Sequence, residues 1–162
     1  MLLHIANYLD ATRWTIEAGE AIPIGAVIRV ANNAGVRTAY LVDDADAALL
    51  VPGNYGVAFK VLADPLGVAS STAPASFGDR TVSIAEGDSI VQVDRGGILE
   101  YDVSLLHDSL NPNEGGTLPV AGAALGIKDG LFCTAATVDA IVSPVVGRVF
   151  DILGSRVRIQ VV

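Results

Sequence analysis

Residues 145–162 read Val-Val-Gly-Arg-Val-Phe-Asp-Ile-Leu-Gly-Ser-Arg-Val-Arg-Ile-Gln-Val-Val, and this stretch contains the clearest predicted hairpin of the chain. The turn-forming triplet Leu153-Gly154-Ser155 separates two runs rich in Val and Ile, as is typical of a β-hairpin. In the second run the polar residues are Arg156, Arg158 and Gln160, and they alternate with Val157, Ile159 and Val161. This period of two predicts a strand with one solvated and one buried face.

The same pattern continues toward the N-terminus, because short apolar runs are separated by many of the 17 Gly and 7 Pro residues. Residues 21–31 and 37–43 form a second predicted hairpin around a turn at residues 32–35, where Asn and Gly tolerate positive φ. Further strands are expected at residues 55–63, 80–85, 89–94, 98–103, 118–127 and 131–135. Helix signals are weak, and residues 43–50 fit either two helical turns or an acidic loop. The prediction is an all-β fold, a small β-barrel or β-sandwich-like domain.

The domain organisation follows from the length, from the apolar, strand-forming N-terminal segment and from one internal segment without clear periodicity. A chain of 162 residues and 16.7 kDa is long enough for one self-sufficient domain. We therefore predict an extended N-terminal arm over residues 1–15 and a single β domain over residues 16–162. Residues 66–79 are rich in Ser, Pro and Gly and are expected to form a long loop or a linker.

The composition excludes some partners and favours others. Of the residues, 51% are hydrophobic and 17% are charged. The charged fraction is lower than the roughly 25% of typical soluble proteins, so the chain is unusually apolar. We expect part of this apolar surface to be covered in an oligomer or against a large partner. The net charge of −8 and the absence of any run of Lys or Arg argue against binding nucleic acid or an anionic membrane.

Gly87-Asp88-Ser89 and His107-Asp108 contain the residue types of a serine hydrolase. A working triad also needs correct distances and an oxyanion hole, and Gly-Asp-Ser between two strands fits a turn better. We therefore predict that the chain is not an enzyme.

Metal and thiol chemistry are not expected either. The acidic group Asp43, Asp44 and Asp46 lacks the downstream Gly and Glu of a calcium loop and fits a solvated corner. Cys133, the only cysteine, lies in an apolar run and is predicted to be a buried structural thiol. No cofactor is predicted.

Three features together resemble the virion structural proteins of tailed bacteriophages, and among them the head decoration (cement) proteins. These are the Lys-poor, turn-rich β character, the pattern from Leu118-Pro119-Val120-Ala121-Gly122 to Gly126-Ile127, and the C-terminal run quoted above. The resemblance implies a small β-barrel or sandwich fold, frequent trimers, and binding to the outside of the mature capsid. It transfers no functional residue, because the binding surfaces of that family have no fixed motif.

The expected function is therefore that of a capsid decoration protein that stabilises the phage head, with the major capsid protein and further copies of itself as partners. Its location would be the outer capsid surface of the virion, after assembly in the host cytoplasm. The alternatives are a tail or baseplate structural protein and a small β-barrel hydrolase. The predicted contact residues lie in the N-terminal arm and are Leu2, Leu3, Ile5, Tyr8, Arg13 and Trp14.

Overall fold

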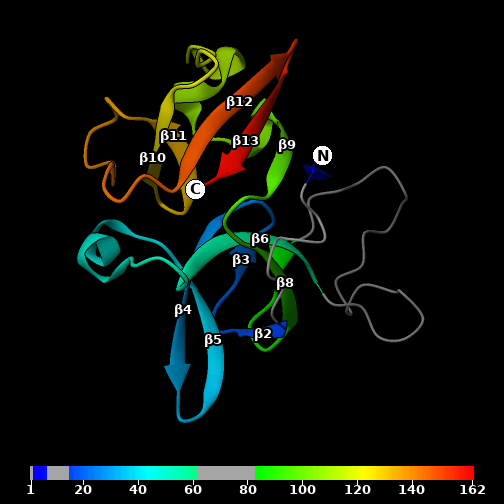
Figure 1. The fold of residues 1–162 in the computed structure, drawn as a ribbon, viewed down its shortest axis with the longest axis vertical. Helices are drawn as coiled ribbons and strands as arrows, with labels where there is room; N and C mark the ends of the chain where they lie inside the picture. Colours follow the sequence, from blue (N-terminus) through cyan, green and yellow to red (C-terminus); the bar gives the residue numbers. More distant parts are fainter. Residues whose placement is uncertain (1, 7–14, 62–82) are drawn as a thin grey trace.

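A computed structural model describes residues 2–6, 15–61 and 83–162, and most of its regular structure is β-strand. The prediction of an all-β fold is confirmed. Figure 1 shows two parts, a small barrel in the lower half and an open sheet in the upper half. The chain as a whole is therefore not one closed barrel.

The barrel consists of five strands in the order β2 (Thr15–Ala18), β5 (Val36–Leu41), β4 (Val27–Asn33), β6 (Tyr55–Val61) and β8 (Ser89–Val93). It closes because β2 pairs in parallel with β5 and antiparallel with β8. A five-stranded barrel leaves little interior space. Accordingly, its core is built mainly from Ala and Ile, including Ile16, Ala18, Ile28, Ala39, Ala58 and Ile90. The two-stranded ladder of β3 (Ile22–Pro23) and β7 (Ser83–Ile84) adds Ile22 and Ile84 to this core.

The open sheet has six antiparallel strands in the order β1 (Leu2–Ala6), β9 (Ile98–Asp102), β13 (Arg156–Val161), β12 (Gly147–Leu153), β10 (Ala124–Lys128) and β11 (Leu131–Thr134). The predicted C-terminal hairpin is present as β12 and β13, with Leu153 opposite Arg156. Its apolar alternation also holds, since Val157, Ile159 and Val161 are buried. In the core, the rings of Tyr101 and Phe132 meet edge to face at 5.8 Å.

The barrel and the sheet are joined by hydrogen bonds and by a shared core. The Tyr101 hydroxyl donates to the Gly25 carbonyl at 3.0 Å, and the Tyr55 hydroxyl donates to the Val162 carbonyl at 3.0 Å. The Val27 amide donates to the Gly130 carbonyl at 2.7 Å. Gly130 has φ +74°, and a Cβ there would lie 2.6 Å from Leu41 Cδ2, so the two parts approach too closely for a larger residue.

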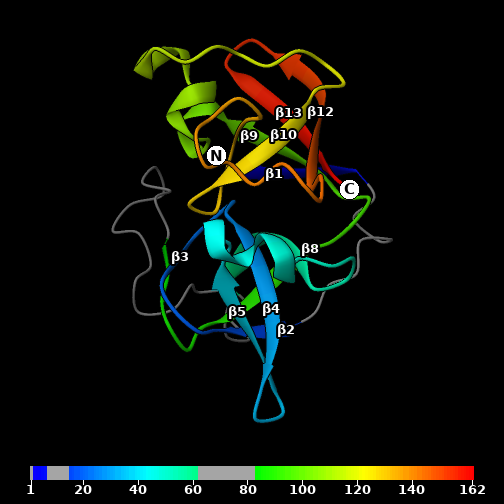
Figure 2. The same ribbon diagram turned by 90° about the vertical axis from the view of Figure 1, so that its left-hand side faces the viewer.

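The hairpin predicted at residues 21–43 is present as β4 and β5, but its details differ from the prediction. The expected strand at residues 21–31 is broken at Gly25, whose φ is 89°, into β3 and β4. The turn is shorter than expected, because Asn33 already pairs with Val36 and only Ala34 and Gly35 form the loop. Both loop residues have positive φ, as a tight two-residue hairpin turn requires. Figure 2 shows this hairpin projecting below the rest of the barrel.

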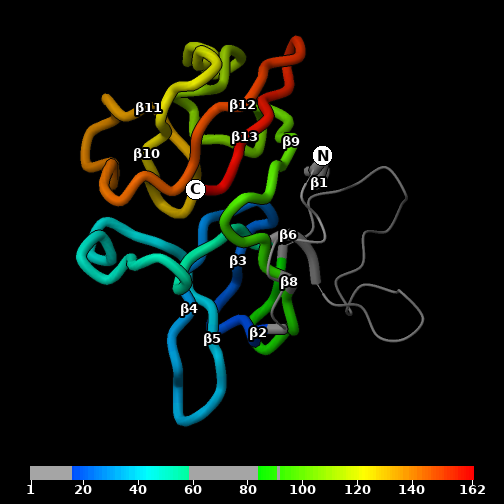
Figure 3. The backbone as a smooth tube through the Cα atoms, viewed as in Figure 1, coloured from blue at the N-terminus to red at the C-terminus, as the bar shows by residue number. Residues whose placement is uncertain are grey.

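The helical structure in the described ranges is limited to short 3-10 helices: η1 (Asp44–Leu49), η2 (Val103–Leu105), η3 (Asp108–Leu110) and η4 (Pro112–Glu114). Of the two alternatives for residues 43–50, the helical one is correct, although the helix is of the 3-10 type. Asp43 caps it, since its carboxylate accepts the Ala45 amide at 2.9 Å. Figure 3 shows the path of the backbone through these short helices and the neighbouring strands.

Candidate interaction surface

The predicted contact residues divide into two groups. Leu2, Leu3 and Ile5 belong to β1, whereas Tyr8, Arg13 and Trp14 lie outside the described residues. β1 pairs antiparallel with β9, from Leu2 opposite Tyr101 to Ala6 opposite Ile98. Residues 2–6 of the expected arm therefore lie against the sheet of their own chain as its edge strand, and whether they also contact a partner stays a prediction. The expected loop or linker at residues 66–79 lies outside the described residues and also stays a prediction.

The outward backbone groups of β1 follow from the register. The Val103 amide donates to the Ser155 carbonyl at 3.2 Å, and the Gly97 carbonyl accepts from the Val161 amide at 2.9 Å. The odd-numbered residues of β9 therefore direct their backbone N–H and C=O groups toward β13. Successive residues of a strand direct their backbone groups to opposite sides, so the backbone N–H and C=O of Glu100 point toward β1. Its partner there is Leu3, whose backbone groups point back toward β9. Leu2 and His4 therefore direct their N–H and C=O groups away from the sheet. Among the described strands, none pairs with this outer side.

The opposite edge of the sheet, β11, is capped by the segment around η3. The His107 amide donates to the Phe132 carbonyl at 3.0 Å, and the Thr134 amide donates to Ser109 Oγ at 3.1 Å. Ser109 Oγ also lies 3.1 Å from His107 Nδ1, which fixes the capping side chain. Capping of this kind prevents an edge from pairing with another chain.

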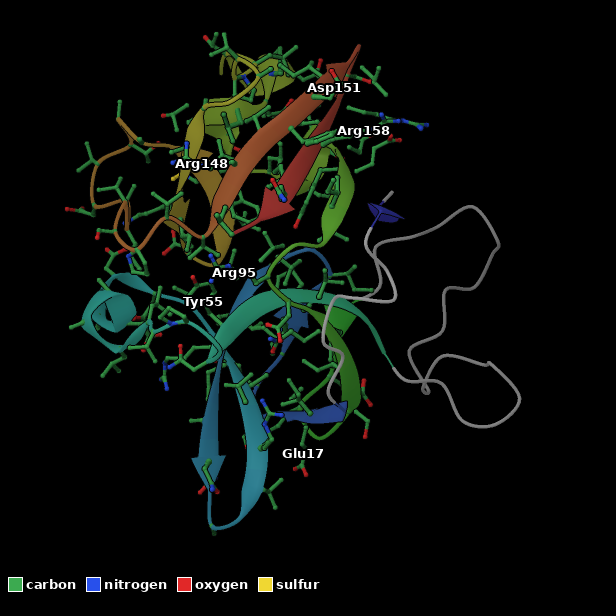
Figure 4. The ribbon with its side chains drawn as sticks, in the orientation of Figure 1. Glu17, Tyr55, Arg95, Arg148, Asp151 and Arg158 are labelled. Carbon is green, nitrogen blue, oxygen red and sulfur yellow. The ribbon has the colours of Figure 1, made fainter. Side chains whose placement is uncertain are left out.

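An ion-pair cluster lies on β9 and β13, one strand inward from β1. Glu100 is only 4% exposed, and its carboxylate oxygens contact Arg156 Nη1 at 2.8 Å and Arg158 Nε at 3.1 Å. The hydrogen bond from Arg156 lowers the pKa of Glu100, and the bond from Arg158 acts in the same direction. Arg158 Nη1 also lies 3.7 Å from Asp151 Oδ2, and Figure 4 labels both residues. These contacts hold β9 and β13 in register beside the edge strand.

The residues considered for hydrolysis are used structurally. Gly87 has φ 85° in the turn before β8, and the Asp88 carboxylate accepts the Ala85 amide at 3.0 Å, which matches the turn interpretation. Ser89 belongs to the barrel, where it pairs with Glu17, whereas His107 caps η3 against the open sheet. The structure thus gives Asp88 and His107 roles in a turn and a cap and shows no contact between Ser89 and His107.

The residues considered for metal and thiol chemistry also have local partners. Arg29 Nε contacts Asp46 at 2.8 Å, and Lys128 Nζ contacts Asp44 at 3.0 Å. Cys133 is buried, as predicted, and burial raises the pKa of its thiol. Within residues 2–6, 15–61 and 83–162, no group of three or more His, Cys, Asp or Glu side chains could hold a metal ion.

Comparison with known proteins adds no relative. No protein-family model matches the chain, and no curated protein or solved structure matches it significantly. In the described part of the chain, no helix has the length and apolar character needed to span a membrane. The interpretation of the surface therefore depends on the geometry given above.

Proposed function

We propose that this chain is a structural virion protein that binds the outer surface of a tailed-phage head and stabilises it. The observation that carries the proposal is the outer edge of β1, where Leu2 and His4 direct backbone donors and acceptors away from the sheet. A sheet edge of this kind can bind an extended segment of another protein by strand addition. The proposed partner at this edge is the major capsid protein.

A decoration protein stabilises a head by mass action. A ligand that binds only the assembled lattice lowers its free energy by RT ln(1 + [L]/Kd), and this term applies at every copy. Strand addition suits the task because backbone hydrogen bonds supply affinity largely independently of side-chain sequence. The β11 edge is capped by His107 and Ser109, whereas none of the described strands pairs with the outer side of β1, so β1 is the proposed edge for such a contact.

The second proposed partner is the protein itself, as a homotrimer. Large apolar side chains remain on the surface of the described residues, among them Val120 at 72% and Val138 at 78% exposure. Covering such side chains between copies would add to stability. A light-scattering mass of three chains is expected, and a monomeric mass at micromolar concentration would remove the trimer from the proposal.

The decisive experiment adds the purified protein to expanded heads that lack it and counts decorated sites by electron microscopy. The wild-type protein should occupy the outer surface and raise the temperature at which heads disassemble. His4→Pro removes an outward N–H but keeps the bonds that face β9, since proline is tolerated where a strand's N–H faces solvent. This variant should lose head occupancy.

His4→Ala is the matched control, because it changes the same side chain and keeps the outward N–H. It should decorate heads like the wild type. Circular dichroism and thermal unfolding of both variants establish that the fold is intact. Full occupancy by a folded His4→Pro variant would contradict binding through β1. Binding to tails or baseplates but never to heads would replace the head proposal by the tail alternative.

A further inference from the structure

A second surface lies in the barrel rather than in the open sheet. It is a groove of about 560 Å³ between the projecting β4–β5 hairpin and the turn that precedes β8. Its lining includes Glu17, Gly19, Asn33, Tyr40, Glu86 and Gly87. Figure 4 shows the Glu17 side chain at the lower end of the barrel, below β2 and away from the open sheet. The groove is therefore separate from the edge of β1.

The groove is held in shape by close packing and backbone hydrogen bonds. A Cβ at Gly19 would lie 2.5 Å from the Tyr40 ring, so the ring packs directly against the backbone there. The Gly19 amide donates to the Ala39 carbonyl at 2.9 Å, and the Gly87 amide donates to the Ala18 carbonyl at 2.8 Å. These bonds tie the turn before β8 to β2 and β2 to β5. A preformed groove lowers the entropic cost of binding.

The charge in the groove has one sign. Glu17 and Glu86 are exposed, and neither forms an ion pair with another described residue. Lys and Arg are absent from the described residues that line the groove. The nearby Arg29 lies 5.9 Å from the centre of the Tyr40 ring, but its guanidinium already contacts Asp46 at 2.8 Å. Among the described residues, the two groove carboxylates therefore have no cationic partner.

We propose that this groove binds an extended, positively charged segment of a partner protein, whose Lys or Arg side chains contact Glu17 and Glu86. The volume accommodates long side chains, and the ring edge of Tyr40 adds apolar contact for their methylene groups. A second copy of this chain is a poorer occupant, because Arg156 and Arg158, its one pair of cations at the i, i+2 spacing of an extended segment, already contact Glu100. The overall charge of −8 would also steer a basic segment toward the protein.

The test uses the folded, ¹⁵N-labelled full chain and two probes, tetralysine and tetraglutamate, followed by NMR. Tetralysine should produce saturable shifts of the Gly19 and Gly87 amide signals, whereas tetraglutamate should not. The double variant Glu17→Gln/Glu86→Gln should weaken tetralysine binding about tenfold, as expected for the loss of two exposed ion pairs. Added salt should weaken binding to the wild type.

The matched control is Glu114→Gln/Asp139→Asn, which removes the same charge from exposed residues that do not line the groove. It should bind tetralysine with nearly wild-type affinity. Equal weakening in both double variants, or shifts spread over the whole acidic surface, would overturn the proposal. Its failure is distinguishable from failure of head decoration, since the peptide titration needs no heads and the β1 variants leave the groove unchanged.

Discussion

The barrel and the open sheet satisfy their backbone hydrogen bonds in different ways. In the barrel, β2 pairs on both sides and no strand is left at an edge. In the sheet, two strands remain at edges, and among the described segments only the one around η3 caps an edge, that of β11. Because a closed barrel has no unpaired strand edge, a partner of the barrel must bind to side chains, as we propose for the groove. The sheet can also bind a partner through the outward backbone groups of β1.

The largest effect is expected at the junction of the two parts. Tyr101→Ala should reduce the free energy of unfolding by about 3–5 kcal/mol, because it removes a fully buried ring that packs on Phe132. Tyr101→Phe should cost about 1–2 kcal/mol, since it leaves the Gly25 carbonyl without its donor. Urea unfolding followed by probes in both parts measures these values. Separate transitions for barrel and sheet in the wild type would show that the shared core does not couple them.

The ion pairs behind the edge strand come next. Glu100→Gln should destabilise the protein by about 1–3 kcal/mol, because Arg156 and Arg158 lose a buried carboxylate. Glu114→Gln, at an exposed position, should change little. Both variants are compared by urea unfolding at neutral pH.

The pH dependence follows from the lowered pKa of Glu100. In the unfolded chain the carboxyl titrates near its ordinary value of 4.5, and in the folded protein it titrates lower. Its contribution is therefore complete above that pH and is lost as the pH falls through the folded pKa. Glu100→Gln should flatten this part of the stability profile. An unchanged acid slope would exclude the ion-pair explanation.

A smaller effect is expected at the capped edge. Ser109→Ala removes the acceptor of the Thr134 amide and should cost about 1 kcal/mol. Hydrogen exchange of Thr134 should become faster, while exchange of Cys133, which faces β10, should change less. If Thr134 exchange stays slow, the cap is not what protects this edge.

The smallest effect is expected on the exposed surface of the sheet. Phe150 lies at the irregularity of β12 between Val149 and Asp151 and is 55% exposed. Phe150→Ser should change the unfolding free energy of the monomer by no more than about 0.5 kcal/mol. A larger loss in a concentration-dependent thermal melt would place Phe150 in a contact between copies.

The sequence predicted what local pattern determines. The alternation in residues 156–162 identified β13 and its buried face, and the Asn and Gly around residue 34 identified the first hairpin. The closure of the barrel could not be predicted, because it depends on β2 pairing with strands about 20 and 75 residues away, with no local signal. Gly25 was overlooked as a break, although Pro23 and Gly25 together are a turn signal.

The candidate surfaces depend on contacts between segments that are far apart in the sequence. The N-terminal segment was expected to be extended, and β1 is, but its pairing with β9 is a long-range contact that sequence does not reveal. The groove combines residues of β2, the hairpin and the turn before β8, so no motif marks it. The role of Glu100 could not be predicted, since a single acidic residue in an apolar strand becomes informative only when pairing places Arg158 opposite it and brings Arg156, which is opposite Asp102, into contact with it.

The turn between β12 and β13 has a practical consequence. Residues 153–156 are exposed, Gly154 has φ 62°, and nothing lies within 4 Å of the position where its Cβ would be. Figures 1 and 2 place this turn at the end of the molecule opposite the β4–β5 hairpin. A foreign peptide inserted between Gly154 and Ser155 would be displayed away from the acidic groove, so the chain offers a scaffold for presenting epitopes.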